Sequence, residues 1–399
     1  MTRTTSVAII AVSLLAIAGV AAGQTTFTPL GNLGGTDVYS EAWAVSRDGA
    51  VVVGGSPSRP SNPQDAAFLW VGGTLAELAP GGNDLPGGSI LSRALGISAN
   101  GSIAVGLSAY NGVRTHAFKF GPGDAALVDL VNISPQTPEL TAANDISAAE
   151  AISDDGAVIV GRGFRQATSN SEACFWLNGA PGATGIGDLT GGIARSDAHG
   201  VSGNGLVIVG EANSASGREA FSWTQAGGMV GLGDATGGGF DSTAYAASTD
   251  GNVIVGYGTT ASGVEATRWL GGLPRTLGDL PGGDISSTAF AVSGNGTVVV
   301  GSGDAGRPDP TFPIFNTPEA IIWDVRHGMR RLADEFGAAV PAGWIPISAN
   351  GVTITATATV VVGSGYNSSN DIEAYVATLP RFCPADVNDS GTVTVQDIF

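Results

Sequence analysis

The sharpest group of oxygen-bearing side chains lies near the C-terminus, in the stretch DVNDSGTVTVQD at residues 386–397. Counted as a twelve-residue loop, it carries such residues at positions 1, 3, 5, 7, 9 and 12: Asp386, Asn388, Ser390, Thr392, Thr394 and Asp397. Oxygen ligands at alternate positions, including the Thr392 carbonyl, can wrap a hard cation, while Gly391 at position 6 permits a sharp turn. The stretch predicts a weak calcium site, because it has only two side-chain carboxylates. An ordinary polar turn is the alternative.

A second group of polar residues recurs directly before a repeated alanine, in strand-like runs that end in an aromatic residue. The seven positions hold five carboxylates and one histidine: Ala66, His116, Glu172, Glu219, Glu265, Glu319 and Glu373. They could form an acidic ring that binds cations near an axis, or each could supply one hydrogen bond to a repeated serine or a turn amide. We favour the second interpretation, because repeated units often share a structural brace.

A third set of positions differs from copy to copy, in the middle of an alternating run of the form AxA. These residues are Trp43, Leu95, Glu150, His199, Tyr245, Phe290 and, in the last copy, Ile345. Exposed aromatic residues at a fixed place could stack on sugars. Burial between packed sheets is the favoured alternative, because aromatic residues in strands usually belong to the core.

The sequence offers no catalytic motif. His116, His199 and His327 lie outside any recognisable nucleophile or metal pattern. Runs such as GDLPGG are turns rather than phosphate loops, since no lysine follows them. Two cysteines are too few for a disulfide framework, and Cys174 in EACFWL is expected to be a buried thiol.

These residues belong to seven copies of one unit, and each copy contains an Asn-Gly or Asp-Gly hairpin signal. The glycines are Gly49, Gly101, Gly156, Gly205, Gly251, Gly296 and Gly351, and a serine stands three residues before each. The stretch AVSGNGTVVVG, residues 291–301, predicts a strand, then a tight turn, then a second strand that ends at the last glycine. Each unit contains four short strands: a Leu-rich strand such as RTLGDL, the AxA strand, the VVVG strand and the aromatic-ended strand. No segment has a convincing helical period.

Seven four-stranded units of about 50 residues predict an all-β fold, a seven-bladed β-propeller. One blade cannot bury both faces of its sheet, so closing a ring explains the copy number. A Leu-rich strand at residues 29–33 precedes the first hairpin, and we expect it to complete the seventh blade. The last copy has a stretched segment, GVTITATATVVVG, which predicts a longer or bulged hairpin.

Composition and the N-terminus indicate an exported protein. Residues 1–23 place Arg3 before an apolar run and small residues, which is typical of a signal peptide rather than a membrane anchor. The net charge of −18 argues against nucleic acid and anionic membranes as partners. We therefore expect a signal peptide at 1–23, the propeller at 24–380, and a linker with the calcium loop at 381–399.

The repeats resemble the extracellular HAF-repeat family of bacterial secreted proteins, named for a His-Ala-Phe run. That run occurs at His116, Ala117 and Phe118, and LGDLPGG, AVSGNG, VVVG and EAFSW also fit the pattern over residues 26–380. The resemblance implies a propeller-like secreted protein and carries no defined activity.

The tail, with CPAD before the loop and Asp397 at position 12, resembles the first EF-hand-like calcium loop of a dockerin module. The family docks secreted proteins onto cohesin-like partners or cell surfaces. A dockerin has two such loops with helices, so this segment is either truncated or vestigial.

Together these features favour a monomeric, secreted, non-catalytic propeller that presents a binding or structural surface, with carbohydrate or a cohesin-like protein as partner. A secreted enzyme acting on polysaccharide is the alternative. An acidic funnel with paired carboxylates and aromatics would favour the enzyme, and a funnel filled by Ala, Val and Gly would favour the binding protein.

Overall fold

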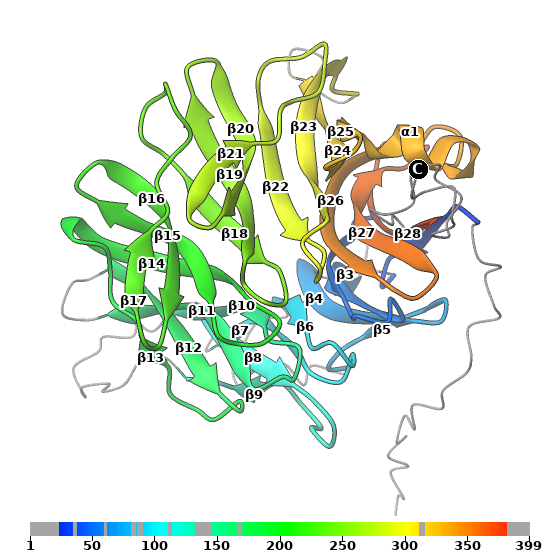
Figure 1. Cartoon of the computed structure of the whole chain (residues 1–399). Coiled ribbons are helices and arrows are strands. Elements are labelled where there is room, and N and C mark those ends of the chain that lie inside the picture. The colour runs from blue at the N-terminus through cyan, green and yellow to red at the C-terminus, as the bar shows by residue number, and fades with distance from the viewer. Residues whose placement is uncertain are drawn as a thin grey trace, which may run out of the picture.

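The computed structural model describes residues 24–34, 38–59, 62–80, 85, 91–110, 114–131, 146–165, 170–310 and 316–380. It confirms the predicted fold: seven four-stranded antiparallel sheets are arranged as the blades of a propeller (Figure 1). The expected signal peptide and calcium loop lie outside the described residues. Within those residues, no helix is long and apolar enough to cross a bilayer.

The blades are numbered along the chain, and the strands of each are given from the axis outwards. Blades 1 to 3 are β2 (Glu41–Val45), β3 (Val51–Arg59), β4 (Asn62–Val71), β5 (Thr74–Glu77); β6 (Ser92–Ile97), β7 (Ala104–Tyr110), β8 (Arg114–Phe120), β9 (Val128–Asp129); and β10 (Ser147–Ile152), β11 (Val158–Arg165), β12 (Asn170–Leu177), β13 (Thr184–Gly185). Blades 4 and 5 are β14 (Gly191–Val201), β15 (Ile208–Ser214), β16 (Gly217–Thr224), β17 (Gly228–Gly231); and β18 (Thr243–Ala247), β19 (Val253–Thr260), β20 (Gly263–Leu270), β21 (Leu273–Thr276). Blades 6 and 7 are β22 (Ser287–Val292), β23 (Val298–Pro308), β24 (Asn316–Asp324), β25 (Gly328–Arg331); and β26 (Ile345–Ile354), β27 (Ala358–Tyr366), β28 (Ile372–Pro380), β1 (Thr26–Gly31).

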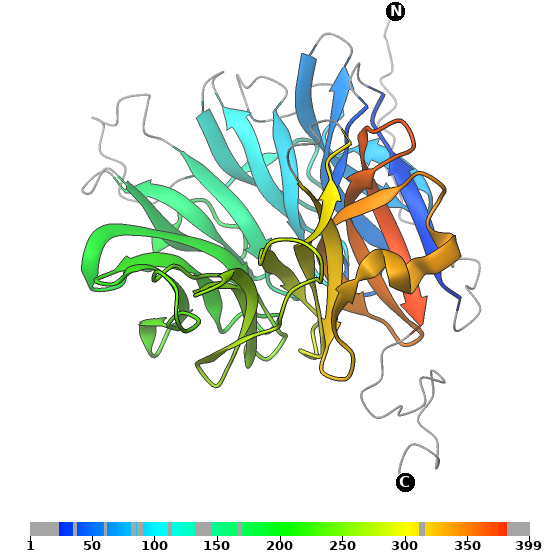
Figure 2. The same cartoon turned by 90° about the horizontal axis from the view of Figure 1, so that it is seen from above.

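The N-terminal strand completes the seventh blade, as expected from the phase of the repeat. β1 pairs antiparallel with β28, from Thr26 opposite Thr378 to Gly31 opposite Ala374. Figure 2 shows this blue strand beside the red C-terminal one. The two ends of the propeller are thus held in one sheet, which closes the ring.

The hairpin prediction holds in blades 1 to 6. Each of these glycines has a positive φ, for example 75° at Gly296. The serine three residues earlier closes the turn: Ser293 Oγ donates to Asn295 Oδ1 at 2.7 Å and accepts the Val298 N–H at 3.0 Å. The repeated serine and Asn-Gly pair therefore form one turn motif.

Three details of the predicted elements are wrong. In blade 7, Gly351 is not a turn residue, because β26 runs through it with a register shift and turns only after Ile354. The VVVG glycine does not end its strand, since β23 continues from Gly301 to Pro308. A five-residue helix, α1 (Leu332–Phe336), followed by a 3₁₀ turn (Gly337–Ala339), replaces part of the predicted strand RRLAD.

A repeated serine joins six of the seven blades to the one before it. These serines are almost fully buried: Ser40, Ser92, Ser147, Ser196, Ser242 and Ser287. Each hydroxyl accepts the N–H of the repeated alanine on the preceding blade at 2.9 to 3.0 Å. At the ring closure this bond runs from Ala374 in β28 to Ser40, just before β2. Buried backbone groups between blades are thereby satisfied.

Candidate binding site

The propeller axis is surrounded by the innermost strand of every blade, β2, β6, β10, β14, β18, β22 and β26. At the end of these strands, backbone hydrogen bonds link one blade to the next. The Arg47 N–H bonds to the Ala99 carbonyl at 3.0 Å, Ala99 to Asp154 at 3.0 Å, and Asp154 to Gly203 at 2.9 Å. These bonds hold the inner strands close together at this end of the axis.

One side chain crosses the axis at the same end. All seven inner strands line a cavity of about 140 Å³ here. Arg47 donates to the Asp154 carboxylate on blade 3 and, at 2.7 Å, to the Thr249 hydroxyl on blade 5. The next level of the cavity is apolar: Val45, Ile97, Ile152, Val201, Ala247, Val292 and Val352. This end of the funnel is thus lined by Val, Ile and Ala side chains and plugged by Arg47.

The variable AxA position is a β-bulge in every blade, which the sequence did not reveal. Register shifts fall at Trp43, Leu95, Glu150, His199, Tyr245, Phe290 and Asn350. The seventh member is therefore Asn350, and the assignment to Ile345 was wrong. All seven residues are half-buried. Three of them form an aromatic arc, with Tyr245 at 5.3 Å from His199 and 5.9 Å from Phe290 between ring centroids.

Five of the seven residues before the repeated alanine make structural contacts, and three of these are the hydrogen bond to a turn amide that was favoured from the sequence. They lie on the third strand of each blade, away from the axis. Glu172, Glu219 and Glu373 accept the N–H of Gly187, Gly233 and Gly31 at 3.0, 3.1 and 3.0 Å. Glu319 instead pairs with Arg307 at 2.9 Å, and His116 bonds to Asp129 at 2.9 Å. The alternative of an acidic ring at the axis is therefore wrong.

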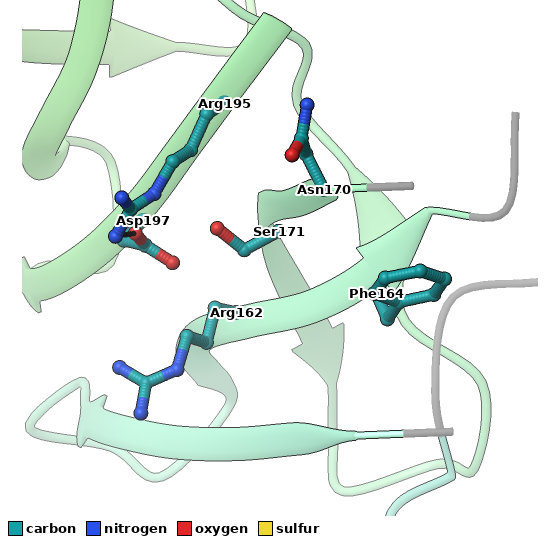
Figure 3. A pocket seen from close by; sticks show the side chains of 6 residues that line it. All are labelled: Arg162, Phe164, Asn170, Ser171, Arg195 and Asp197. Carbon is teal, nitrogen blue, oxygen red and sulfur yellow. Dashed lines mark hydrogen bonds and ion pairs between the residues drawn. The ribbon is translucent and has the colours of Figure 1, made fainter. Parts of the chain in front are cut away.

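A pocket of about 550 Å³ opens at seam 3/4, where seam n/m denotes the interface between blades n and m. Figure 3 shows its lining: Arg162, Phe164, Asn170, Ser171, Arg195 and Asp197, contributed by β11, β12 and β14. Its size is typical of small-molecule sites. Sequence analysis identified none of these residues.

Ion pairs fix two sides of the pocket. Arg162 Nη1 lies 3.0 Å from Glu150 Oε1. Glu150, one of the seven bulge residues near the axis, therefore holds the Arg162 side of the pocket in place. Arg195 Nη2 lies 3.3 Å from Asp197 Oδ2. Asp197 is only 3% exposed, and its other oxygen, Oδ1, has no hydrogen-bond partner among the described residues. A buried unpaired carboxylate oxygen is costly, so a donor from a water molecule or a ligand would stabilise it.

Two other seams close at the same register through ion pairs. Ser171 corresponds to Asp65 in blade 1 and Arg218 in blade 4, since each lies opposite the equivalent residue of the second strand. At seam 1/2, Asp65 binds Arg93 at 2.6 Å. At seam 4/5, Arg218 binds Asp241 at 2.7 Å and approaches Glu211 at 3.6 Å. Seam 3/4 has the short Ser171 there, which leaves the space open.

Replacing Glu41 with glutamine should stabilise the protein at neutral pH. Burial at seam 1/2 raises the pKa of Glu41, although the Tyr39 hydroxyl and Arg93 oppose that shift. A raised carboxyl pKa means that stability present at low pH is lost as pH rises through the unfolded value of about 4.3 towards the folded one. Glu41→Gln should therefore melt higher than wild type at pH 7 and alike near pH 4. A melting-temperature gap that narrows with rising pH would contradict this account.

The remaining candidate residues have structural surroundings. Cys174 is buried and free, which confirms the expected burial, and burial raises the pKa of its thiol. His327 bonds to Asp324 at 3.0 Å, and His199 lies 4.0 Å from Glu211. No cluster of three or more His, Cys, Asp or Glu suited to a metal occurs among the described residues. The predicted calcium ligands Asp386, Asn388, Ser390, Thr392, Thr394 and Asp397 lie outside them.

Comparison with known proteins supports the architecture. No family model and no curated protein sequence matches the chain. The β-propeller domain of the Trilobed protease from Pyrococcus furiosus is 12% identical with a TM-score of 0.51, over 89% of this chain and 97% of that one. A putative TolB from Agrobacterium tumefaciens is 15% identical with a TM-score of 0.44, over 73% and 91%. TolB from Acinetobacter baumannii is 10% identical with a TM-score of 0.41, over 84% and 65%. The first likeness shows that this chain shares the β-propeller fold.

Proposed function

We propose that the protein is a non-catalytic binding propeller that holds a small ligand at seam 3/4. The open pocket carries this proposal, because the same register is filled by ion pairs at seams 1/2 and 4/5. Its buried Asp197 oxygen lacks a partner among the described residues, which supports a ligand there.

The surroundings of the axis favour binding over catalysis. Hydrolysis of a glycosidic bond ordinarily needs two carboxyl groups about 5 to 10 Å apart, both accessible to substrate. The seven bulge residues include one carboxylate, Glu150, which forms an ion pair with Arg162 at 3.0 Å. At the other end of the funnel, Asp154 is engaged by Arg47. The charged groups near the axis thus serve the scaffold.

The proposal also includes export and attachment to a surface. The signal-like N-terminus and the calcium-loop pattern at 386–397 support a secreted protein carried to a cohesin-like partner or cell surface. Retention of the full chain on its producing cells, and release by a calcium chelator, would be the expected behaviour. Retention unaffected by the chelator would remove calcium from the attachment.

A ligand screen tests the binding function. Residues 24–399 should be screened by thermal shift against metabolites, amino acids, nucleosides and sugars, beside the variant Ser171→Arg. This substitution places at seam 3/4 the residue that closes seam 4/5. A true ligand should raise the melting temperature of wild type and leave the variant unchanged. If no compound discriminates between the two proteins, the proposed binding function fails.

A further inference from the structure

We infer that the pocket at seam 3/4 recognises an uncharged saccharide unit; this inference rests on the proposed binding function and names its ligand class. Three properties of the pocket support it: its balanced charge, its hydrogen-bonding groups and its aromatic wall.

The charges around the pocket balance. Arg162 is paired with Glu150 at 3.0 Å, and Arg195 with Asp197 at 3.3 Å. Two cations and two carboxylates leave no net charge to attract an ion, and the whole chain carries −18. An anionic ligand would face the repulsion of that overall charge, and neither an anion nor a cation would find an unpaired opposite charge among these two ion pairs. A neutral polar ligand avoids both costs.

The hydrogen-bonding groups suit vicinal hydroxyls. A hydroxyl can donate and accept at once, so it can bridge a carboxylate and a guanidinium. Asp197 Oδ1 is buried and, in the carboxylate form, can only accept, so a donor such as a sugar hydroxyl would satisfy it. The Ser171 hydroxyl can donate or accept, while Arg162 and Arg195 supply N–H donors on opposite walls (Figure 3).

The remaining wall is aromatic. Phe164 lies on the same strand as Arg162, two residues further along, and lines the pocket. Its half-buried ring offers an apolar face for the C–H groups of a pyranose. Polar groups that fix hydroxyls beside one aromatic face complement both surfaces of a sugar ring. An amino acid or nucleoside would present a charge or a flat base instead.

Titration calorimetry with matched monosaccharides tests the inference. Methyl glycosides of neutral hexoses should be compared with the corresponding uronates and amino sugars, using residues 24–399. We expect a neutral glycoside to bind, with an affinity nearly independent of salt between about 0.05 and about 0.5 M, because no net charge is neutralised. Asp197→Asn should weaken binding by on the order of tenfold or more, since it alters a buried charged acceptor.

Three further variants separate a binding role from a folding role. Ser171→Arg should abolish binding but also lower the melting temperature, because it adds a third guanidinium beside Arg162 and Arg195, whereas Arg218 of blade 4 meets Glu211 and Asp241.

Ser171→Gln fills part of the same space without a charge, so it should abolish binding while keeping the melting temperature near that of wild type. Asp65→Asn is the matched control, since it alters a buried carboxylate at seam 1/2 and should leave sugar affinity unchanged.

Each outcome decides the inference. Tighter binding of a uronate that weakens with salt would overturn it in favour of an anion site. Sugar binding that survives in Ser171→Arg would place the site elsewhere and overturn it too. A non-sugar ligand that discriminates wild type from Ser171→Arg would overturn the saccharide while leaving the binding function standing.

Discussion

Deleting residues 24–34 is expected to lower the melting temperature by on the order of 10 °C, because it removes the strand that closes the ring. Phe27 of β1 stacks on Tyr375 at 4.7 Å and contacts Phe336 and Trp344 at 5.6 and 5.3 Å between ring centroids. Leu30 is 7% exposed in the core between blades 7 and 1. The Gly31 N–H is the group that the Glu373 brace binds. Differential scanning calorimetry measures the effect.

Two further experiments test whether β1 closes the ring. Phe27→Ala should give an intermediate loss, because it removes the ring cluster and leaves the strand pairing. A synthetic peptide of residues 24–34, added in excess to the truncated protein, should restore much of the melting temperature by mass action. An unchanged melting temperature on deletion would show that blade 7 is stable with three strands and that β1 does not latch the ring.

Much of the fold could be predicted from the sequence because each blade repeats the same local chemistry. An Asn-Gly or Asp-Gly pair with Ser three residues before the glycine marks a turn wherever it closes two apolar runs, and blades 1 to 6 follow it. A Leu-rich strand precedes the first hairpin and none follows the last aromatic-ended strand. The N-terminal strand was therefore predicted to supply the missing strand of the seventh blade. The carboxylates before the repeated alanine were also predicted as braces, and Glu172, Glu219 and Glu373 each accept the N–H of a glycine as a brace would.

Other features depend on the packing of neighbouring strands, which a single repeat does not encode. In blade 7 the pair Asn350-Gly351 has the hairpin composition, yet Asn350 is a bulge whose amide donates to the Ala42 carbonyl of blade 1 at 2.9 Å. The turn moves to residues 355–357 because Thr355 accepts the Ala358 N–H at 3.0 Å. The composition at Asn350-Gly351 is the same as in the other blades. The different register of β26 accompanies the contact between Asn350 and Ala42 at the ring closure.

The pocket could not be predicted from the sequence for a related reason. The features that the copies share single out the brace position, Glu172, and not its neighbour Ser171. That neighbouring position holds two charged residues, Asp65 in blade 1 and Arg218 in blade 4, and five uncharged ones in the other blades: Thr115, Ser171, Val264, Pro318 and Ile372. Its meaning required knowing that this position faces the next blade, as the ion pairs to Arg93 and Asp241 show.

The VVVG glycine gives the second large expected effect. At this glycine an added Cβ would overlap a carbonyl oxygen of the inner strand in every blade: Gly54, Gly106, Gly161, Gly210, Gly256, Gly301 and Gly363. In blade 6 that oxygen belongs to Thr288, two residues before the bulge at Phe290. Close backbone approach, rather than the end of a strand, therefore explains the repeated glycine.

Gly301→Ala should cost about 3 kcal/mol of folding free energy or more, because a backbone carbonyl cannot rotate away as a flexible side chain would. Gly303→Ala is the matched control on the same strand, where the nearest atom to a Cβ would be Ile321 Cγ2 at 3.3 Å. Chemical denaturation of both variants should show a loss several times larger for Gly301→Ala. Equal losses would mean that the inner strand can relax and that the bulge does not require glycine opposite it. The bulge in β22 also determines where the Phe290 side chain lies near the propeller axis. If blade 6 tolerates Gly301→Ala, the position of Phe290 is therefore expected to shift as well.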